Sequence, residues 1–355
     1  MAHDGENASS GWRDLFDQMS RLQAEMEAQC DRPLDRAEGT RYLARLLAAG
    51  LSRFNGRPGS GIDWDTPRIG GFNPDYRFGH ARLDPGGSYR LHGTMNDARR
   101  LALSTHVGAF GTARPVGHLA TDRIRSDAAG RFEIDIGHEA PHGSQNWLPI
   151  SSTTDTLMIR QLLTRRTDRP AELDLERIDT PTAASAMEVL TVEAQHDRMG
   201  IVALFVAGAA GRFFRWTELI SRLSNTIEPV PAEIEDEVRA DPDTFYAIGS
   251  FDLADDERLE IRLTPPACDY WGLHTTNHWL EPIEHDSLVC HRNDVTSEPN
   301  EDGSVTISIA PVEDRRPNAM HTLGHHNGAI FYRVVGATGP DVALPVCTIR
   351  ERSGT

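Results

Sequence analysis

The sequence predicts a mainly β protein with helical segments, built as a tandem duplication in which helices precede a jelly-roll-like antiparallel β-sandwich. The first observation is a strand-turn-strand pattern that occurs twice, with equivalent residues 172 or 173 positions apart by subtraction: Gly130 and Gly303, Asn146 and Asn318, Arg160 and Arg333. The second is that both copies consist of short alternating runs separated by turn residues, which is typical of antiparallel sheets. An internal repeat of this kind has to be recognised before the fold is argued.

The first copy begins with two amphipathic helices. Residues 1–10 are small, polar and charged, and we expect a disordered tail there. From Gly11 onward, apolar residues recur at helical spacing behind the capping candidates Ser9 and Ser10. Asp35 can cap a second helix, which Gly56 and Pro58 would end.

The first β region follows from residue 68 to about residue 177, and a second from 245 to about 348. A turn signal at 83–88 precedes the alternating strand Tyr89-Arg90-Leu91-His92. Helical signals return at Asp179-Thr180-Pro181, where a capping residue precedes a proline. The sequence therefore predicts a first repeat over 11–178 and a second over 179–355.

The overall charge argues against two classes of partner. The 355 residues carry 53 acidic and 36 basic side chains, a formal charge of −17, which repels nucleic acid and anionic membranes alike. Four scattered cysteines and an N-terminus without signal-peptide character predict a cytoplasmic protein. The most apolar stretch, residues 199–210, is too short to cross a bilayer and predicts a buried helix.

The candidate catalytic residues come from a comparison of the two copies. Residues 97–106 align with residues 269–278 at an offset of 172 by subtraction, and both segments begin with Asp and end with His. In the second copy these are Asp269 and His278. His274 lies four residues before His278, so on a strand the two would share a face. We take His278 or His274 as a general acid/base, because imidazole transfers protons near neutral pH.

Aromatic and polar residues around these histidines form the candidate ligand site. The second copy holds Tyr270, Trp271, Trp279, Glu281 and His321, and its loops are richer in histidine than those of the first copy. An aromatic cleft with a few polar groups favours a small-molecule ligand, here an apolar or ring-shaped metabolite. This predicts an enzyme of lyase, isomerase or hydrolase type.

Two alternatives stay open. The same cleft could belong to a non-catalytic protein that binds carbohydrate or another small ligand. No cofactor is predicted, but His274 and His278 with Glu281 or a later histidine could hold a divalent metal. The string His138-Glu139-Ala140-Pro141-His142 matches a zinc-protease motif. That motif requires a helix, and the proline inside the string makes a helix unfavourable there. Asn146 and Asn318 recur in equivalent loops, which predicts one shared turn geometry.

The residues of both copies resemble a known family. The run Gly130 to Ile136 with Asn146-Trp147-Leu148-Pro149, and the later run from Pro265 through Tyr270-Trp271 to Arg333, are similar to bacterial proteins of the domain-of-unknown-function family 1214. The resemblance covers both β regions, most clearly the second, although Ala319 and Met320 replace the Trp-Leu pair there. It implies a jelly-roll-like β-sandwich and no accepted catalytic residues.

Overall fold

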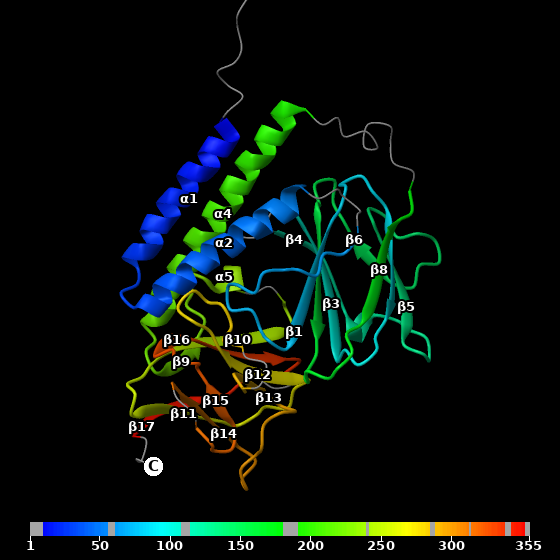
Figure 1. Cartoon of the computed structure of the whole chain (residues 1–355). Helices are drawn as coiled ribbons and strands as arrows, with labels where there is room; N and C mark the ends of the chain where they lie inside the picture. The colour runs from blue at the N-terminus through cyan, green and yellow to red at the C-terminus, as the bar shows by residue number, and fades with distance from the viewer. Residues whose placement is uncertain are drawn as a thin grey trace, which may run out of the picture. The chain divides into compact units, whose positions relative to one another are not determined.

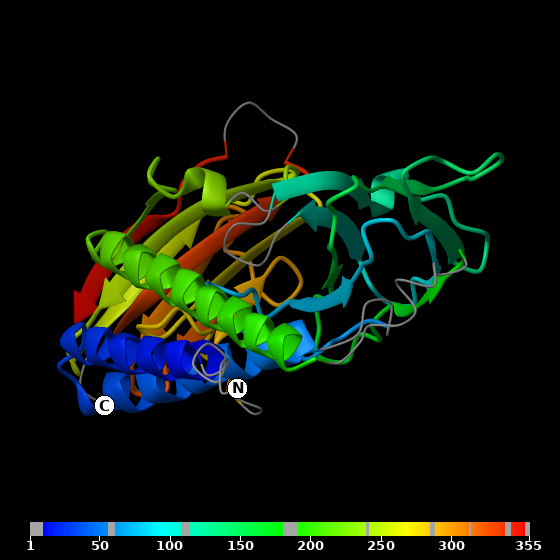
Figure 2. The same ribbon diagram turned by 90° about the horizontal axis from the view of Figure 1, so that it is seen from above.

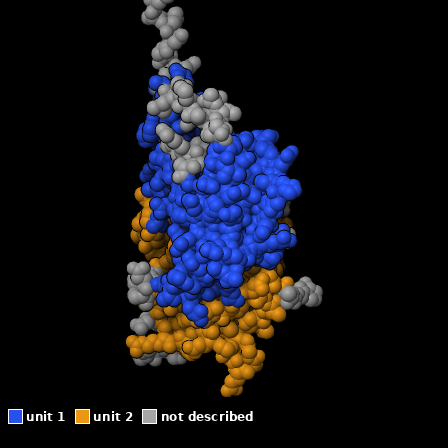
Figure 3. All heavy atoms as spheres, turned by 90° about the vertical axis from the view of Figure 1, so that its right-hand side faces the viewer, with its two compact units in different colours: residues 1–29, 43–67, 76–210 blue, residues 30–42, 68–75, 211–355 orange. Residues whose placement is uncertain are grey.

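The computed structural model describes residues 10–55, 61–107, 114–179, 191–238, 241–284, 288–311, 314–337 and 342–351. The chain forms two compact units, coloured in Figure 3. Unit 1 contains Met1–Gln29, Leu43–Pro67 and Tyr76–Ala210, and unit 2 contains Cys30–Tyr42, Arg68–Asp75 and Gly211–Thr355. These units are defined by compactness and not by repetition, so the repeats 11–178 and 179–355 stay a prediction.

Both helices predicted at the N-terminus are present. They are α1 (Ser10–Ala28) and α2 (Pro33–Asn55), and Leu15, Leu22 and Met26 of α1 are buried as their spacing predicts. Within unit 1, α1 lies along the first part of α4, because a Cβ on Gly11 would stand 2.3 Å from the carbonyl oxygen of His196 (Figure 2). The predicted tail lies outside the described residues except for Ser10, which begins α1.

Helix α4 (Val192–Ser221) has 30 residues. The sequence indicated a buried helix from the apolar stretch 199–210 alone, so the predicted length was wrong. Its length, and the mean hydropathy of 1.3 in its most apolar 18-residue segment, would allow the helix to cross a membrane. However, 56% of that segment is buried within the protein. The core helix of a globular protein has the same properties. Residues 180–190, where the sequence predicts a helix start, lie outside the described residues.

The strands of unit 1 form two four-stranded sheets (Figure 1). The bounds are β1 Tyr76–Arg82, β2 Tyr89–Thr94, β3 Arg100–Val107, β4 Arg114–Ala120, β5 Arg131–Gly137, β6 Trp147–Pro149, β7 Thr156–Leu162 and β8 Glu172–Arg177. A short 3-10 helix, η1 (Thr121–Arg123), follows β4. The sheet orders are β1-β7-β3-β4 and β6-β5-β2-β8, and side chains from both sheets form one hydrophobic core.

Unit 2 contains two further four-stranded sheets. The bounds are β9 Thr226–Pro229, α5 Glu235–Val238, β10 Thr244–Asp252, β11 Glu257–Leu263, β12 Tyr270–Thr275, β13 His291–Asn293, β14 Val305–Ala310, β15 Ala319–His321, β16 Asn327–Val335 and β17 Val346–Glu351. The orders are β10-β16-β12-β13 and β15-β14-β11-β17, again around one core. The prediction of a mainly β fold with helical segments is confirmed.

The strand orders of the two units correspond position by position. The first sheet of unit 1 contains β1, β3, β4 and β7. In chain order, these strands occupy the same places as β10, β12, β13 and β16 in unit 2, and the second sheets correspond likewise. The single parallel pairing of each set, β5 with β6 and β14 with β15, also falls at the same place. A tandem duplication would produce this correspondence. The duplication, the sandwich and the jelly roll stay predictions.

The pairing register corrects one alignment made from the sequence. Arg160 pairs with Ala102, and its equivalent Arg333 pairs with Gly272, an offset of 170 by subtraction. At that offset His274 corresponds to Ser104, and His278 does not correspond to His106. The same register makes Phe78 the equivalent of Tyr246, and each lies under its copy's arginine, 5.7 Å and 5.5 Å from the guanidinium carbon.

The asparagines of the two loops have the shared structural role that the sequence predicts. The Asn146 side chain accepts from the N–H of Arg125 at 2.7 Å and donates to the carbonyls of Arg125 and Glu133 at 2.9 and 2.8 Å. Asn318 makes the same three bonds, to the backbone of Glu298 and to the carbonyl of Thr306. Each side chain therefore bridges the loop to its neighbouring strand.

Candidate functional site

Strand β12 carries three of the predicted site residues, and all three are buried. The Tyr270 hydroxyl donates to the Asp75 carboxylate at 2.8 Å and accepts from the Asn73 amide at 3.0 Å. Asp75 also accepts from the Asn293 amide at 2.9 Å. Trp271 lies in the hydrophobic core of unit 2. Neither aromatic ring lines either of the two cavities described below.

His274 is the third residue of this strand, with only 1% of its surface exposed. Its ring stacks on Phe331, with centroids 5.2 Å apart and planes 9° from parallel. Burial, and then the nearby Arg333 guanidinium, lower the pKa of His274 well below its ordinary value. The imidazole is therefore neutral and packed, with an aromatic ring on one face.

Asp269 immediately precedes β12, His321 ends β15, and neither lines the cavity that His278 borders, described below. Asp269 is exposed, and its carboxylate lies so close to Gly336 that a Cβ there would be 2.1 Å from it. Gly336 also has a φ of +65°, which favours glycine. His321 ends β15, half-buried, and its N–H donates to the carbonyl of Val289 at 2.8 Å. Both residues therefore have contacts that are typical of turns and strand ends.

Glu281 belongs to a network of charged and polar groups in unit 2. Glu38 and Arg41 come from α2, Asn277 and Glu281 from the turn after β12, and His325 from the turn before β16. Arg41 donates to both carboxylates at 3.0 Å. The Asn277 amide donates to Glu38 at 2.8 Å and to Glu281 at 3.1 Å. Apart from Arg41, every member is at most 8% exposed.

The electrostatics of this network favour an ion pair. His325 Nε2 lies 3.0 Å from a carboxylate oxygen of Glu38. Burial alone would lower the pKa of His325, but its hydrogen bond and charge interaction with Glu38 raise it. Burial likewise would raise the pKa of Glu38, but His325 and Arg41 lower it. Each group therefore favours the charged form of the other.

Trp279 joins the same region to helix α2. Its indole N–H donates to the carbonyl of Asp35 at 2.7 Å, and its ring stacks on Tyr42 at 6.1 Å between centroids. Trp279 is 1% exposed. The predicted ligand residues Trp279 and Glu281 thus connect the first part of α2 to the turn after β12.

His278 borders a cavity of about 180 Å³ in unit 2. Three elements and two turns surround this space, and the lining residues are Thr217, Ile220, Ser221, Ser224, Ser250, Phe251, Asp252, His278, Leu280, Asn327, Gly328 and Ala329. Two of these lining residues each have a buried polar atom without a hydrogen-bond partner among the described residues: His278 Nε2 and Asn327 Oδ1. A buried polar atom without a partner costs free energy unless a ligand or water satisfies it.

The His278 ring is held in place by its neighbours. Thr217 donates its hydroxyl hydrogen to the His278 carbonyl at 3.1 Å, which fixes the backbone. The ring meets Trp279 edge-on, with centroids 4.7 Å apart and planes at 84°. Burial lowers the pKa of His278, and the opposing attraction of Asp35 does not reverse this. At neutral pH the imidazole is therefore uncharged and can accept a proton.

The sequence could not identify the other residues of this pocket. Thr217 lies near the end of helix α4. Ser250 and Asn327 are 77 residues apart by subtraction and lie on β10 and β16, two strands that pair with each other. No motif links them, because only the β10–β16 pairing brings them together. Among the described residues, no group of three metal-ligating side chains includes His274 or His278, so the geometry gives the metal alternative no support.

Comparisons with known proteins show similarity to structures without an assigned activity. The crystal structure of an uncharacterised protein from Burkholderia cenocepacia matches with a TM-score of 0.87 and 29% identity over 97% of both chains. A protein from Vibrio parahaemolyticus matches in fold alone, with a TM-score of 0.52 and 14% identity over 88% of this chain and 98% of the other. No curated protein matches.

The family comparison matches a single segment of the chain. This segment is residues 80–165, in the first β region, whereas the sequence indicated both regions and most clearly the second. The matching model is described as a protein of unknown function, so it assigns no catalytic residue. Residues 80–165 match the family DUF1214, and for this segment the match confirms the family resemblance indicated by the sequence.

Proposed function

We propose that the protein is an enzyme that performs acid–base chemistry on a small molecule bound beside His278. The observation that carries the proposal is that His278 lines this cavity and has a buried ring nitrogen, Nε2, without a hydrogen-bond partner among the described residues. A perturbed titratable group in a concave site is a functional candidate on physical grounds. The other predicted histidine, His274, stacks against Phe331 and lines no described cavity.

The lowered pKa of His278 sets its chemical role. A neutral imidazole can take a proton from a bound molecule at neutral pH, and the imidazolium so formed can return the proton later in the reaction. Asn327 Oδ1 accepts a hydrogen bond, so it can orient a hydroxyl or amine of the same molecule. One group would transfer the proton while the other holds the substrate.

The cavity favours a small substrate. Its volume of about 180 Å³ equals roughly six water molecules at ~30 Å³ each. Its lining combines apolar side chains such as Phe251 and Leu280 with hydroxyl and amide groups, so it suits a small molecule that has both an apolar part and a polar group. From the cysteine content and charge of the sequence we also propose a cytoplasmic location and no nucleic-acid or membrane partner.

Non-catalytic binding in the same pocket is the second candidate. The two polar atoms without partners support it equally, since a bound ligand would satisfy both without any proton transfer. The two candidates differ in the pH dependence that His278 should confer on activity but not necessarily on binding.

A thermal-shift screen tests the proposal. The probes are small alcohols, amides, amines and carboxylic acids, applied to the wild type, His278→Gln and His326→Gln. His326 is a matched control, because it lies on a nearby turn and contacts the Leu253 carbonyl at 2.9 Å and Asp255 at 3.6 Å. We expect probes that stabilise the wild type and His326→Gln but not His278→Gln. Equal responses from all three proteins would contradict the proposal.

Any probe identified in this way then distinguishes catalysis from binding. For catalysis, we expect His278→Gln to reduce kcat about a hundredfold or more, the usual contribution of a general acid or base. A probe that binds without conversion across pH 5–9 would favour the non-catalytic candidate.

A further inference from the structure

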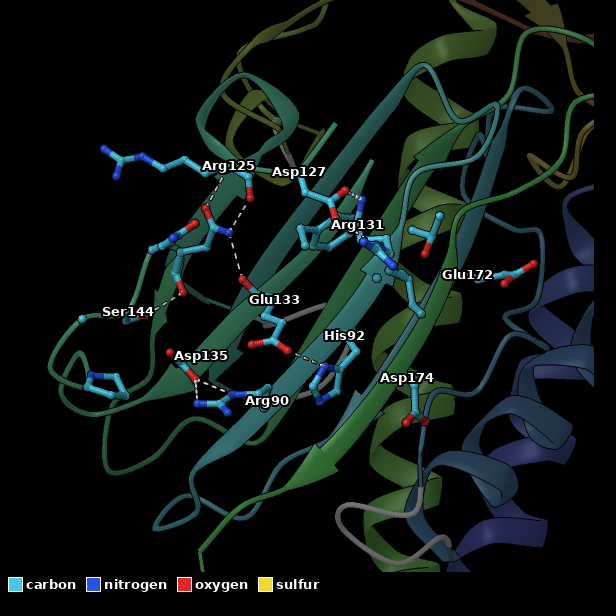
Figure 4. A pocket seen from close by; sticks show the side chains of 18 of the residues that line it. Arg90, His92, Arg125, Asp127, Arg131, Glu133, Asp135, Ser144, Glu172 and Asp174 are labelled. Carbon is cyan, nitrogen blue, oxygen red and sulfur yellow. Dashed lines mark hydrogen bonds and ion pairs between the residues drawn. The ribbon is translucent and has the colours of Figure 1, made fainter. Parts of the chain in front are cut away.

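A second concave surface lies in unit 1, on the outer face of the sheet β6-β5-β2-β8. It is a trough of about 830 Å³, bordered by the loops that hold Arg125 and Asp127 on one side and Ser144 on another (Figure 4). This volume falls within the range of sites that bind drug-sized molecules.

Strand alternation explains why the trough is polar. Leu91, Ile134 and Leu175 point inward and belong to the core of unit 1. Their neighbours in the strands therefore point outward. The pairing of β2 with β5 and β8 places these outward residues in three rows: Arg90 between Asp135 and Glu176, His92 between Glu133 and Asp174, and Thr94 between Arg131 and Glu172.

Ion pairs connect the central charged side chains of the trough. Arg90 lies 2.9 Å from Asp135, and Arg131 lies 2.8 Å from Asp127. The two nitrogens of His92 lie 3.2 Å from Glu133 and 3.3 Å from Glu176. Donors and acceptors thus alternate across the outer face of the sheet, and their mutual pairing limits the side-chain freedom that a ligand would have to restrict.

Two charged side chains at the sides of the trough are available to bind a ligand. The Arg125 and Asp174 side chains have no hydrogen-bond or ion-pair partner among the described residues, and Figure 4 shows them on opposite sides. Arg125 offers several N–H donors, whereas the Asp174 carboxylate only accepts. A ligand spanning the trough therefore needs both acceptor and donor groups along its length.

The balance of charge narrows the ligand class. The lining contains three arginines and five carboxylates, a formal charge of −2 with histidine neutral, from Arg90, Arg125, Arg131, Asp127, Glu133, Asp135, Glu172 and Asp174. Anions would meet the carboxylates, and a large apolar ligand would leave these groups desolvated and unpaired. Hydroxyl groups both donate and accept, so a chain of hydroxyls can match an alternating surface of this kind.

We propose that this trough binds a neutral polyhydroxylated molecule of oligosaccharide size, at a site separate from the His278 pocket. Its outward rows hold the hydroxyls through the alternating donors and acceptors, and Arg125 and Asp174 bind the two sides of the chain. Because the ligand is uncharged, its affinity changes little with salt.

The corresponding sheet of unit 2 provides a matched control. By the shared register, with Leu91 equivalent to Ile261 at an offset of 170 by subtraction, His92 corresponds to Arg262. Arg262 forms an exposed ion pair with Asp302. Arg262→Ala therefore removes an equivalent outward side chain without changing the trough.

The test is titration of the full-length, amide-labelled protein with maltotetraose, cellotetraose and xylotetraose, and with spermidine as a cationic probe, followed by NMR. We expect at least one oligosaccharide to shift amides of β2, β5 and β8. Both His92→Ala and the isosteric Asp174→Asn should weaken its binding about tenfold, because each removes hydrogen bonds from the centre or side of the trough. Arg262→Ala should bind like the wild type.

Three outcomes would overturn the proposal: no oligosaccharide shifts these strands, spermidine alone binds there, or the His92 and Asp174 variants bind like the wild type. The His278→Gln variant separates this test from the proposed enzyme function. It should keep oligosaccharide binding even if it loses every ligand of the His278 pocket.

Discussion

At the scale of single residues, the two loop asparagines were predictable and the pocket residues were not. Asn146 and Asn318 satisfy backbone groups close to them, and this local chemistry follows from residue type and turn context. His278 was a candidate from the sequence and borders a cavity in the structure, and its catalytic role stays a prediction. Asn327 carries no comparable signal, because its place at the cavity depends on strand pairing.

The asparagine bonds predict a large loss of stability on truncation. Asn146→Ala removes three hydrogen bonds to backbone groups and should lower the free energy of unfolding by about 2–4 kcal/mol, as should Asn318→Ala. Chemical denaturation measures both. The control is the exposed neighbour Gln145, whose replacement by Ala should change stability by less than about 0.5 kcal/mol. An asparagine variant no less stable than Gln145→Ala would contradict the shared role.

At the scale of elements, helices were easier to predict than strand register. The spacing of apolar residues located α1 and α2 almost to their ends, since helix periodicity is a local property. Register depends on hydrogen bonds between distant strands, and a slip of two residues keeps every side chain on the same face. The alignment of His106 with His278 was wrong by such a slip, with an offset of 172 instead of 170.

The contact between α2 and the turn before β16 predicts a pH-dependent contribution to stability. The folded pKa of His325 is raised, so the stabilisation it gives is full below its ordinary value of about 6.5 and is lost as pH rises through the folded value. The folded pKa of Glu38 is lowered from 4.5, so its contribution is present above 4.5 and is lost as pH falls through the folded value. The pair therefore stabilises most between about pH 4.5 and 6.5.

Denaturation of His325→Gln at two pH values measures this contribution. The substitution should cost about 1.5–3 kcal/mol at pH 5.5, where it removes a hydrogen bond between two charged groups, and less at pH 9, where the imidazole is neutral and only the Glu38 carboxylate keeps its charge. His142→Gln is the control, because His142 is exposed and contacts no described charged group. A cost for His325→Gln that is equal at both pH values would show that the ion pair does not form.

At the scale of the whole molecule, repetition in the sequence predicted the repeated strand order before any contact was known. Offsets near 172 over widely spaced positions imply that the same elements recur in the same order, and the four sheets have that order. The sequence could not predict the two compact units, because each draws on three separate segments of the chain. Compactness depends on packing, which local patterns do not encode.

The duplication predicts a specific result for an experimental structure. Each of the strands β1 to β7 should superpose on its equivalent among β10 to β16, in chain order. Arg160 should then coincide with Arg333, and Phe78 with Tyr246. The β8 edge should superpose on β17. Pairing registers that place other residues opposite the two arginines would contradict a common origin of the repeats.

The most direct test of the proposed site is an NMR titration of the imidazole groups between pH 4.5 and 8.5. Two-bond hydrogen–nitrogen spectra of the labelled protein report the protonation of each ring, and His278→Gln assigns the signals of His278. We predict that His278 titrates below the ordinary value of about 6.5, so that at pH 7 its ring is neutral with one nitrogen free to accept a proton. Titration above 6.5, or a ring still charged at pH 7, would contradict the assignment of His278 as the proton-accepting group of the pocket.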